Sequence, residues 1–224
     1  MEPIAHISTE FPTKFGVPRQ PGLVPQLRGR VVFEPHYRNP DSVRGLDGFS
    51  HLWLLWQFSA VLRDEWAPMV RPPRLGGEQR VGVFASRSPF RPNSIGMSVV
   101  ELIDIETDPR FGPVLVVGGA DLMSGTPILD VKPYVPEDRV DAAEFGYITA
   151  SPRRKLAVQW PAEVPAELDQ RRRAALAGLL AEDPRPAYQD DPARSYGFEF
   201  DGLEVKFQVK NDVLQVLTIT SRSA

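Results

Sequence analysis

Short apolar runs separated by proline and glycine set the strongest limit on how this chain can fold. The 224 residues include 23 prolines and 17 glycines, and these residues interrupt helices and favour turns. Before residue 146 the apolar runs have strand length, and nothing alternates strand with helix as a βαβ unit does. We therefore predict a mainly β N-terminal domain over residues 1–146, built as a barrel or a sandwich. The predicted strands are Gly29–Tyr37, Phe49–Phe58, Val81–Ala85, Met97–Glu106, Val114–Val117 and Ile128–Pro136. The aromatic content of Phe49–Phe58 predicts a strand buried on both faces.

The pattern of apolar residues changes near Ala150, from short strand-length runs to helical spacing. Leucines at helical spacing predict an amphipathic helix within Pro165–Asp183, which ends before Pro184. The alternation in Gly197–Asn211 predicts one strand, and a turn then leads into Val213–Ile219 to complete a hairpin. We predict a small α+β C-terminal domain over residues 147–224.

The loop Ser86–Ser94 is a candidate binding element. Pro89 and Pro92 each fix φ and remove a backbone donor, so the loop is stiff. Arg87 and Arg91 on a rigid turn predict a preorganised clamp for a carboxylate or another anion, because guanidinium presents a planar fork of donors. The alternative is an ordinary proline-rich connection with solvated arginines.

Charge is distributed unevenly along the chain. The formal net charge is -3, which gives no global signal for nucleic acid. Between Trp66 and Ser98, however, Glu78 is the one acid among five arginines, Arg71, Arg74, Arg80, Arg87 and Arg91. Such a basic stripe predicts contact with phosphates, and a solvated face is the alternative.

Several functional classes are disfavoured by what the sequence lacks. There is no cysteine, and the three histidines have no ligand spacing, so we expect neither disulfides nor a metal site. The dinucleotide-binding and phosphate-loop glycine motifs and the serine-hydrolase elbow are absent. No apolar run reaches the ~20 residues that span a bilayer, and the N-terminus lacks signal-peptide features. We expect a cytoplasmic protein with no membrane contact.

Other single residues permit two interpretations. Gly118–Ala120 would let a ligand approach the backbone, or would form a bulge at a barrel corner. Asp121 after them could accept a hydrogen bond from a ribose or an amine. His51 and Gln57, in an apolar run, are either satisfied core residues or site residues.

Six motifs together resemble the TsaA-like family, the TrmO-type bacterial tRNA methyltransferases. They run in order from Phe15 as F-G-V-P-R-Q-P-G-L-V, V-R-G-L-D-G-F-S-H-L-W, V-R-P-P-R-L-G-G, G-V-F-A-S-R-S-P-F-R-P-N-S-I-G-M-S, G-T-P-I-L-D-V-K-P-Y and D-P-R-P-A-Y. The resemblance covers about residues 5–220. It departs from the family at Ser94, where the family loop usually has proline, and this change should soften the loop slightly.

The resemblance implies a β-barrel that binds S-adenosylmethionine, a small C-terminal domain that helps to hold tRNA, and a homodimer. It implies methyl transfer to N6 of N6-threonylcarbamoyladenosine at position 37 of tRNA. By family analogy the cofactor contacts would be Arg19, Gln20, Pro21, Gln57, Phe58, Arg87, Met97, Gly118, Gly119, Ala120 and Asp121. Within this set, Arg87 suits the cofactor carboxylate and Asp121 suits its ribose diol or amine.

Residue chemistry supplies further candidates. The phosphate-binding candidates are Arg71, Arg74, Arg91, Lys132 and Arg185, and Tyr134 or Tyr188 could stack on a base. Candidate general bases are His51, Asp121, Asp130 and Tyr134, among which the sequence does not choose. The competing interpretation is a non-catalytic nucleotide- or RNA-binding barrel that works as an adaptor. An adaptor would tolerate the loss of any single arginine, whereas a cofactor pocket would not.

Overall fold

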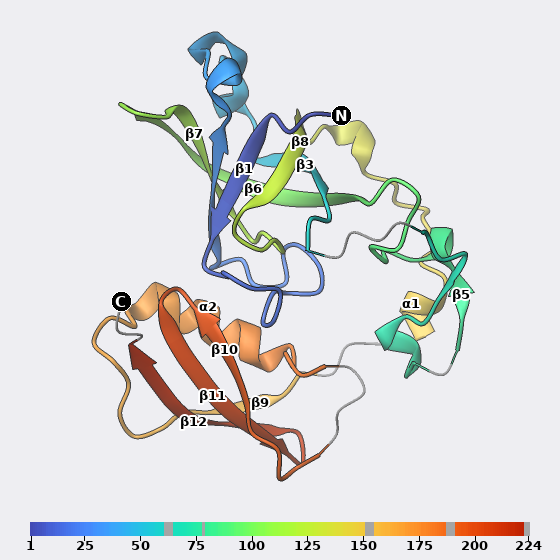
Figure 1. The fold of residues 1–224 in the computed structure, drawn as a ribbon, viewed down its shortest axis with the longest axis vertical. Coiled ribbons are helices and arrows are strands. Elements are labelled where there is room, and N and C mark those ends of the chain that lie inside the picture. The colour runs from blue at the N-terminus through green and yellow to red at the C-terminus, as the bar shows by residue number, and fades with distance from the viewer. Residues whose placement is uncertain (61–64, 78, 151–154, 187–190, 222–224) are drawn as a thin grey trace.

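The computed structural model describes residues 1–60, 65–77, 79–150, 155–186 and 191–221. Its N-terminal part is a closed barrel of antiparallel strands in the order β1-β2-β7-β6-β3-β8 (Figure 1). The barrel strands are β1 (Ala5–Thr9), β2 (Arg28–Phe33), β3 (His51–Gln57), β6 (Ile95–Asp108), β7 (Gly112–Gly118) and β8 (Thr126–Pro133). The prediction of a mainly β fold with a barrel is confirmed.

The barrel interior is filled by alternate residues of each strand. On β3, Leu52 and Leu54 are fully buried and Trp56 is nearly so, and they pack with apolar side chains from the other five strands. The outward residues of β3, such as Trp53 and Leu55, are only partly buried, so the expectation of burial on both faces was wrong. An antiparallel barrel needs to cover only its inner face, whereas helices cover both faces of a parallel sheet.

A long excursion joins β3 to β6. It contains a two-stranded ribbon, β4 (Met69–Val70) and β5 (Val81–Gly82), which pairs Met69 with Gly82. Short 3-10 helices complete the barrel domain at Pro35–Tyr37, Pro40–Val43, Leu46–Gly48, Pro73–Leu75, Val83–Ala85 and Pro136–Asp138.

The predicted strand Val81–Ala85 was wrong in its second half, where Val83–Ala85 forms a 3-10 turn. The turn is closed because Ser86 donates both its N–H and its hydroxyl to the carbonyl oxygen of Val83, at 3.1 and 2.8 Å. Val83 is buried while Phe84 points outward.

The C-terminal part is a helix packed on a four-stranded sheet. The sheet has the order β10-β11-β12-β9, and it consists of β9 (Ala157–Gln159), β10 (Tyr196–Phe200), β11 (Leu203–Lys210) and β12 (Val213–Ser221). The helix α2 (Gln170–Ala181) begins after Asp169, whose side chain accepts from the N–H of Arg172 at 2.8 Å. A one-turn helix, α1 (Tyr147–Ala150), precedes this part of the chain.

The predicted strand Gly197–Asn211 is in fact two strands. Asp201 and Gly202 form a hairpin turn between β10 and β11, with φ of 49° and 77°. Aspartate followed by glycine is a strong signal for this tight turn, because both central residues need positive φ. The second predicted turn, before Val213, is present.

The two parts share the second hydrophobic core. Phe11, Val24 and Leu27 belong to the segment 10–27 between β1 and β2, here called the N-terminal arm. They are nevertheless buried among residues of α2 and the C-terminal sheet. Glu10 adds a polar link between the two parts: its carboxylate accepts from the Arg28 N–H and from Arg171 of α2, each at 3.0 Å. Burial raises the pKa of Glu10 above its usual value, although these hydrogen bonds oppose the shift. In the described ranges, no helix is long and apolar enough to cross a membrane.

Candidate functional site

One end of the barrel brings together the segments that carry the predicted cofactor residues. The end of β3 lies against the start of β6, where Gln57 pairs with Ile95 and the N–H of Phe58 donates to the carbonyl oxygen of Ser94 at 2.9 Å. The turn after β7 lies against the N-terminal arm, because the N–H of Gly22 donates to the carbonyl oxygen of Gly119 at 2.9 Å. Segments that are far apart in the sequence therefore meet at one place.

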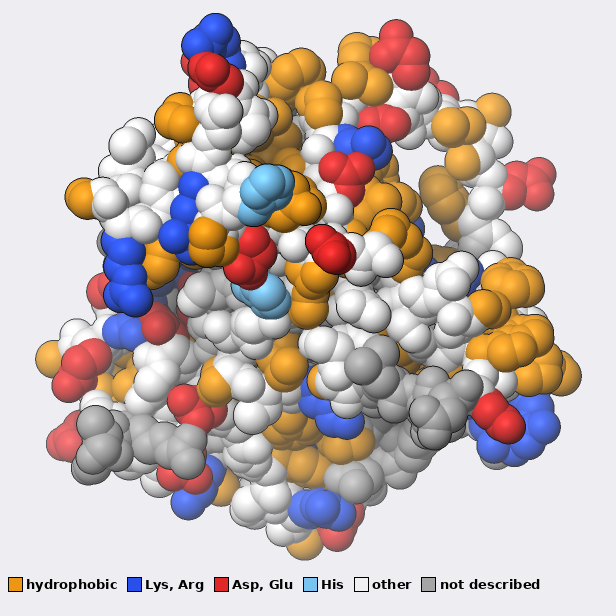
Figure 2. Space-filling view, turned by 45° about the horizontal axis from the view of Figure 1, so that its top comes forward, with side chains coloured by type: hydrophobic (Ala, Val, Ile, Leu, Met, Phe, Trp, Pro, Cys, Tyr) orange, Lys and Arg blue, Asp and Glu red, His pale blue; other side chains and the backbone are white. Residues whose placement is uncertain are grey.

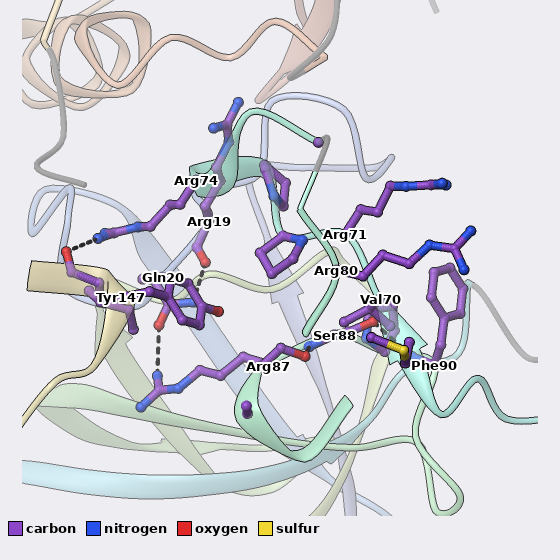
Figure 3. Close-up of a pocket in the computed structure, with 18 of the residues that line it drawn as sticks. Arg19, Gln20, Val70, Arg71, Arg74, Arg80, Arg87, Ser88, Phe90 and Tyr147 are labelled. Carbon is purple, nitrogen blue, oxygen red and sulfur yellow. Dashed lines mark hydrogen bonds between the residues drawn. The ribbon is translucent and has the colours of Figure 1, made fainter. Parts of the chain in front are cut away.

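The arm and the proline-rich loop are joined by a side-chain contact. Nη1 of Arg87 donates to Oε1 of Gln20 at 2.7 Å, and Nε2 of Gln20 donates to the carbonyl oxygen of Arg19 at 2.6 Å (Figure 3). Arg19 reaches the C-terminal part, where its Nη2 donates to the carbonyl oxygen of Arg185 at 3.0 Å. Arg87 thus keeps donors for a ligand, whereas Arg19 is committed in part to a contact between the two parts of the chain.

These residues line a broad groove of about 1770 Å³. It is bounded by the arm, the excursion, α1 and the end of α2, and it includes five arginines, Arg19, Arg71, Arg74, Arg80 and Arg87. In Figure 3, Arg71 and Arg80 extend away from the contact between Arg87 and Gln20. The face seen in Figure 2, by contrast, mixes acidic, basic and hydrophobic side chains. Among the described residues that line the groove, the five arginines face two acids, Glu182 and Asp183.

Asp121 is held by a hydrogen-bonded chain that begins inside the barrel. The indole N–H of Trp56 donates to Oγ of Ser98 at 3.0 Å, and the Ser98 hydroxyl donates to Oδ1 of Asp121 at 2.6 Å. Burial raises the pKa of Asp121 to about 6, while the Ser98 hydrogen bond and the charge of Arg87 act in the opposite direction. A fixed carboxylate near an arginine suits recognition of a ligand that carries both donor and acceptor groups.

Two glycines allow the close packing at this end. A Cβ on Gly96 would lie 2.3 Å from the Trp56 ring, so glycine there leaves room for the indole that begins the hydrogen-bonded chain. Gly119 has a φ of 70°, and a Cβ on it would lie 3.2 Å from Cα of Gly22. The close approach at Gly119 is thus made by the chain's own arm.

Other predicted residues lie on the outer wall of the barrel. Met97 pairs with Leu55 and is 49% exposed, and Asp130 pairs with Leu55 from the other side. Lys132, which was predicted to bind phosphate, forms an ion pair with Asp130 at 2.8 Å. Lys132 therefore already has an acidic partner. Of the predicted cofactor residues, Arg19, Gln20 and Arg87 line the groove. Met97 and Asp121 do not line it in a single chain, and neither does Asp130.

Two of the candidate bases lie at the opposite end of β3. His51 begins the strand whose last residue is Gln57, and six residues of strand span about 20 Å. Tyr134 lies next to His51: its N–H donates to the carbonyl oxygen of His51 at 3.0 Å, and the ring centroids are 6.5 Å apart. Among the four candidate bases, Asp121 is the one that lies with the predicted cofactor residues.

The arginines predicted to bind phosphate have different surroundings. Arg71 and Arg74 line the groove. Nη1 of Arg91 donates to the carbonyl oxygens of Val83 and Ser86, at 3.0 and 2.7 Å, so Arg91 shapes the loop. Arg185 is mostly buried and forms an ion pair with Asp183 at 2.8 Å. Tyr188 and Glu78 lie outside the described residues.

Sequence reasoning missed Trp56 and Ser98 as supports of the site. The available signal was Ser98, a polar residue at an inward position of an apolar strand, where it must find a hydrogen-bond partner. It also missed Trp66 and Phe84, two exposed aromatic residues beside the arginines. In the described part of the chain, histidines and acids form no group of three or more that could hold a metal ion.

Comparison with known proteins decides the family. A model of the tRNA-methyltransferase O N-terminal domain matches residues 6–141, and a model of the TrmO C-terminal domain matches residues 153–222. The chain belongs to the TrmO family. It is 40% identical over 230 residues to the Escherichia coli tRNA (adenine(37)-N6)-methyltransferase, covering 99% of this chain and 97% of that protein.

Two Pseudomonas aeruginosa comparisons extend this family assignment. The chain is 42% identical over 229 residues to a protein named as a candidate S-adenosylmethionine-dependent methyltransferase, covering 98% of this chain and 96% of that one. A crystal structure of TrmO superposes with a TM-score of 0.78 at 33% identity and covers 98% of each chain. The family match therefore holds for sequence and fold along almost the whole chain.

Proposed function

We propose that this TrmO-family protein transfers a methyl group from S-adenosylmethionine to N6 of adenine 37 in tRNA, where the base is N6-threonylcarbamoyladenosine. The observation that carries the proposal is the meeting of the predicted cofactor segments at one barrel end, in a chain that matches tRNA methyltransferases over its whole length. An adaptor would need no partly buried acceptor such as Asp121 near the guanidinium of Arg87.

The residues at this end fit the chemistry of the cofactor. S-adenosylmethionine has a carboxylate, a ribose diol, an adenine and a sulfonium-bound methyl group, and it supplies an activated methyl with a good leaving group. Arg87 would hold the carboxylate through its guanidinium fork. Asp121 would accept hydrogen bonds from the diol or the amine, since its carboxylate is held by Ser98. A groove of about 1770 Å³ has room for the cofactor and for part of a nucleic acid.

In the reaction a bond forms from adenine N6 to the methyl carbon as the bond from sulfur to that carbon breaks. N6 also loses a proton, and its lone pair is delocalised into the ring and the carbamoyl group. The chain contributes mainly by positioning, which can supply several kcal/mol, on the order of 7–11 in favourable cases. Because Asp121 is assigned to the cofactor and the other candidate bases lie away from Arg87 and Gln20, we assign no side chain as the base that takes this proton.

The substrate is tRNA, and we propose that Arg71, Arg74 and Arg80 contact its phosphates. All three line the groove together with Arg19, Gln20 and Arg87. We also propose two functional domains, residues 1–146 for the cofactor and 147–224 for support of tRNA. Since tRNA is the proposed substrate, we place the protein in the cytoplasm.

We further propose a homodimer. The outer wall of β3 and β6 exposes Met97 beside the partly buried Trp53 and Leu55, and a second copy would remove this apolar surface from water. In a dimer Met97 could reach a cofactor although it does not line the groove of its own chain. Light scattering should give twice the chain mass, and Met97→Asp should reduce that mass to one chain.

The test of the proposed function is calorimetric titration of the purified protein with S-adenosylmethionine, followed by methyl-transfer assays on tRNA with and without the threonylcarbamoyl group. We expect Arg87→Ala to lower cofactor affinity about a hundredfold, because it removes a charge-assisted fork. The matched control is Arg139→Ala, a paired arginine outside the groove, which should bind the cofactor as the wild type does. Wild-type protein that binds the cofactor only as tightly as Arg87→Ala, with or without tRNA, contradicts the assignment.

A further inference from the structure

The excursion between β3 and β6 presents two aromatic rings to solvent. Trp66 is 48% exposed and Phe84 is 69% exposed. Their ring centroids are 6.0 Å apart and their planes differ by 21°, so the rings are stacked. Two large rings that stack on each other and not in a core form a flat apolar surface that water solvates poorly.

The surrounding chain fixes this ring pair in place. Val83, next to Phe84, is buried, and its N–H donates to the carbonyl oxygen of Pro68 at 3.0 Å. The Arg91 guanidinium lies 5.7 Å from the Phe84 centroid, while its Nη1 holds the carbonyl oxygens of Val83 and Ser86. Phe84 is therefore turned outward by a hydrogen-bonded turn, and the ring pair is preorganised.

The ring pair lies at the edge of the arginine-rich groove. Phe84 is part of the groove lining, and so are Ala67 and Met69, on either side of Pro68 and close to Trp66 in the chain. Among the described lining residues there are five arginines against two acids, Glu182 and Asp183. A flat aromatic surface beside concentrated positive charge matches an unpaired nucleobase beside its own phosphates.

We propose that Trp66 and Phe84 form a stacking site for an unpaired base of the tRNA anticodon loop, next to the base that is methylated. This rests on the proposed function, since it takes RNA as the substrate. The stacked base would sit at the groove edge while the groove arginines hold the adjacent phosphates. Single-stranded loops suit such a site because their bases can leave the stack at low cost.

The test uses the full-length protein and a fluorescein-labelled anticodon stem-loop RNA that carries N6-threonylcarbamoyladenosine, with the Kd measured by anisotropy. Trp66→Ala and Phe84→Ala should each weaken binding about ten- to a hundredfold, the range for loss of one base–aromatic stack. Trp66→Phe keeps a ring and should stay within about threefold of the wild type. Affinity for S-adenosylmethionine should be unchanged in the two Trp66 variants, because Trp66 does not line the groove. An unchanged midpoint of thermal unfolding shows that all three variants fold.

The matched control is Phe111→Ala. Phe111 also lies under arginines, with Arg38 and Arg110 at 5.3 and 5.0 Å from its centroid, but it is at the β6–β7 turn and outside the groove. Its RNA affinity should equal that of the wild type. A second measurement is quenching of tryptophan fluorescence by the RNA, which should shrink in Trp66→Phe because the quenched indole has been removed.

The outcomes separate the two proposals. If the wild type methylates tRNA but Trp66→Ala and Phe84→Ala bind the stem-loop normally, the stacking site is wrong and the proposed function stands. The stacking site is also wrong if these variants lose only a subunit contact, seen as a smaller mass with normal RNA affinity. If the wild type neither binds the stem-loop nor transfers a methyl group, the function fails and the stacking site fails with it.

Discussion

The barrel end and the C-terminal sheet use buried side chains in opposite ways. Beneath the C-terminal sheet the interior is apolar, built mostly of leucine and valine, and it also includes Phe198, Phe200 and Phe207. At the barrel end the buried residues Trp56 and Ser98 lead to a carboxylate whose pKa is raised to about 6. The first arrangement maximises apolar burial, whereas the second holds a polar group in place and thereby lowers the free energy of unfolding.

The sharpest test of this comparison is Asp121→Asn. The folded chain binds a proton at Asp121 more tightly than the unfolded chain does, since the pKa rises from 3.8 to about 6. The carboxylate therefore destabilises the fold above pH 6, and this penalty disappears below pH 3.8. Asparagine should raise the free energy of unfolding at pH 7.5 by up to about 3 kcal/mol, measured by urea denaturation, and the difference from the wild type should vanish near pH 3.8.

The same variant should lose function as it gains stability. Cofactor affinity of the wild type should fall as the pH drops below about 6, because the carboxylate becomes protonated. Asp121→Asn should bind the cofactor weakly at every pH, and its methyl-transfer rate should fall at least about a hundredfold. Equal methyl-transfer activity of Asp121→Asn and the wild type at pH 7.5 would show that Asp121 is not part of the cofactor site.

The next largest effect is expected at the link between the two parts. Arg171→Ala leaves the carboxylate of Glu10, which is 6% exposed, without its cationic partner. We expect a loss of about 2–3 kcal/mol, below the usual value for a buried pair because Arg171 itself is 38% exposed. The control Lys206→Ala breaks an ion pair that is exposed on both sides and should cost less than about 0.5 kcal/mol. Equal costs in thermal unfolding would mean that burial of Glu10 does not matter.

A smaller loss is expected when the barrel end is overpacked. Gly96→Ala places a methyl group against the Trp56 ring and should cost about 1–3 kcal/mol. Because the indole would shift away from Ser98, cofactor affinity should fall as well. Gly82→Ala, where a Cβ meets nothing within 4 Å, is the control and should leave cofactor affinity unchanged. A stable Gly96→Ala protein with normal affinity would show that the indole position is not needed.

The smallest effect is expected in the C-terminal hairpin. Gly202→Ala puts a side chain on a residue with φ of 77°, and a Cβ there meets no atom within 4 Å. The cost should be about 1 kcal/mol of backbone strain, with unchanged cofactor affinity and methyl-transfer rate. A loss of cofactor affinity would contradict the separation of the two regions.

Much of the fold followed from local patterns in the sequence. The alternation in Met97–Glu106 and the glycine and proline breaks around Val114–Val117 gave strands that are present as β6 and β7. The hairpin turn at Asp201 was missed although the buried positions change phase across it, from Phe198 and Phe200 to Leu203 and Val205. The site was harder to predict, since the chain Trp56–Ser98–Asp121 joins three strands or turns through contacts that no local pattern contains.

The predicted site residues also divide into those that the fold brings together and those that it places apart. Arg87, Gln20 and Asp121 meet because barrel closure brings their segments together. His51 and Tyr134 lie at the other barrel end, since a strand places its first and last residues far apart however near they are in sequence. Spacing along a chain predicts neighbours on a strand, but only closure of the barrel decides which strand ends become neighbours.

The shared second core has a consequence for the order in which the chain can fold during synthesis. Phe11, Val24 and Leu27 leave the ribosome early, but α2 and the hairpin strands that cover them are made last. The barrel itself can close once β8 has emerged to pair with β1. From then until the end of translation, the nascent protein has a closed barrel, but the apolar side chains of the N-terminal arm are exposed to water. Chaperones that bind exposed apolar segments should therefore bind the nascent chain mainly in this interval.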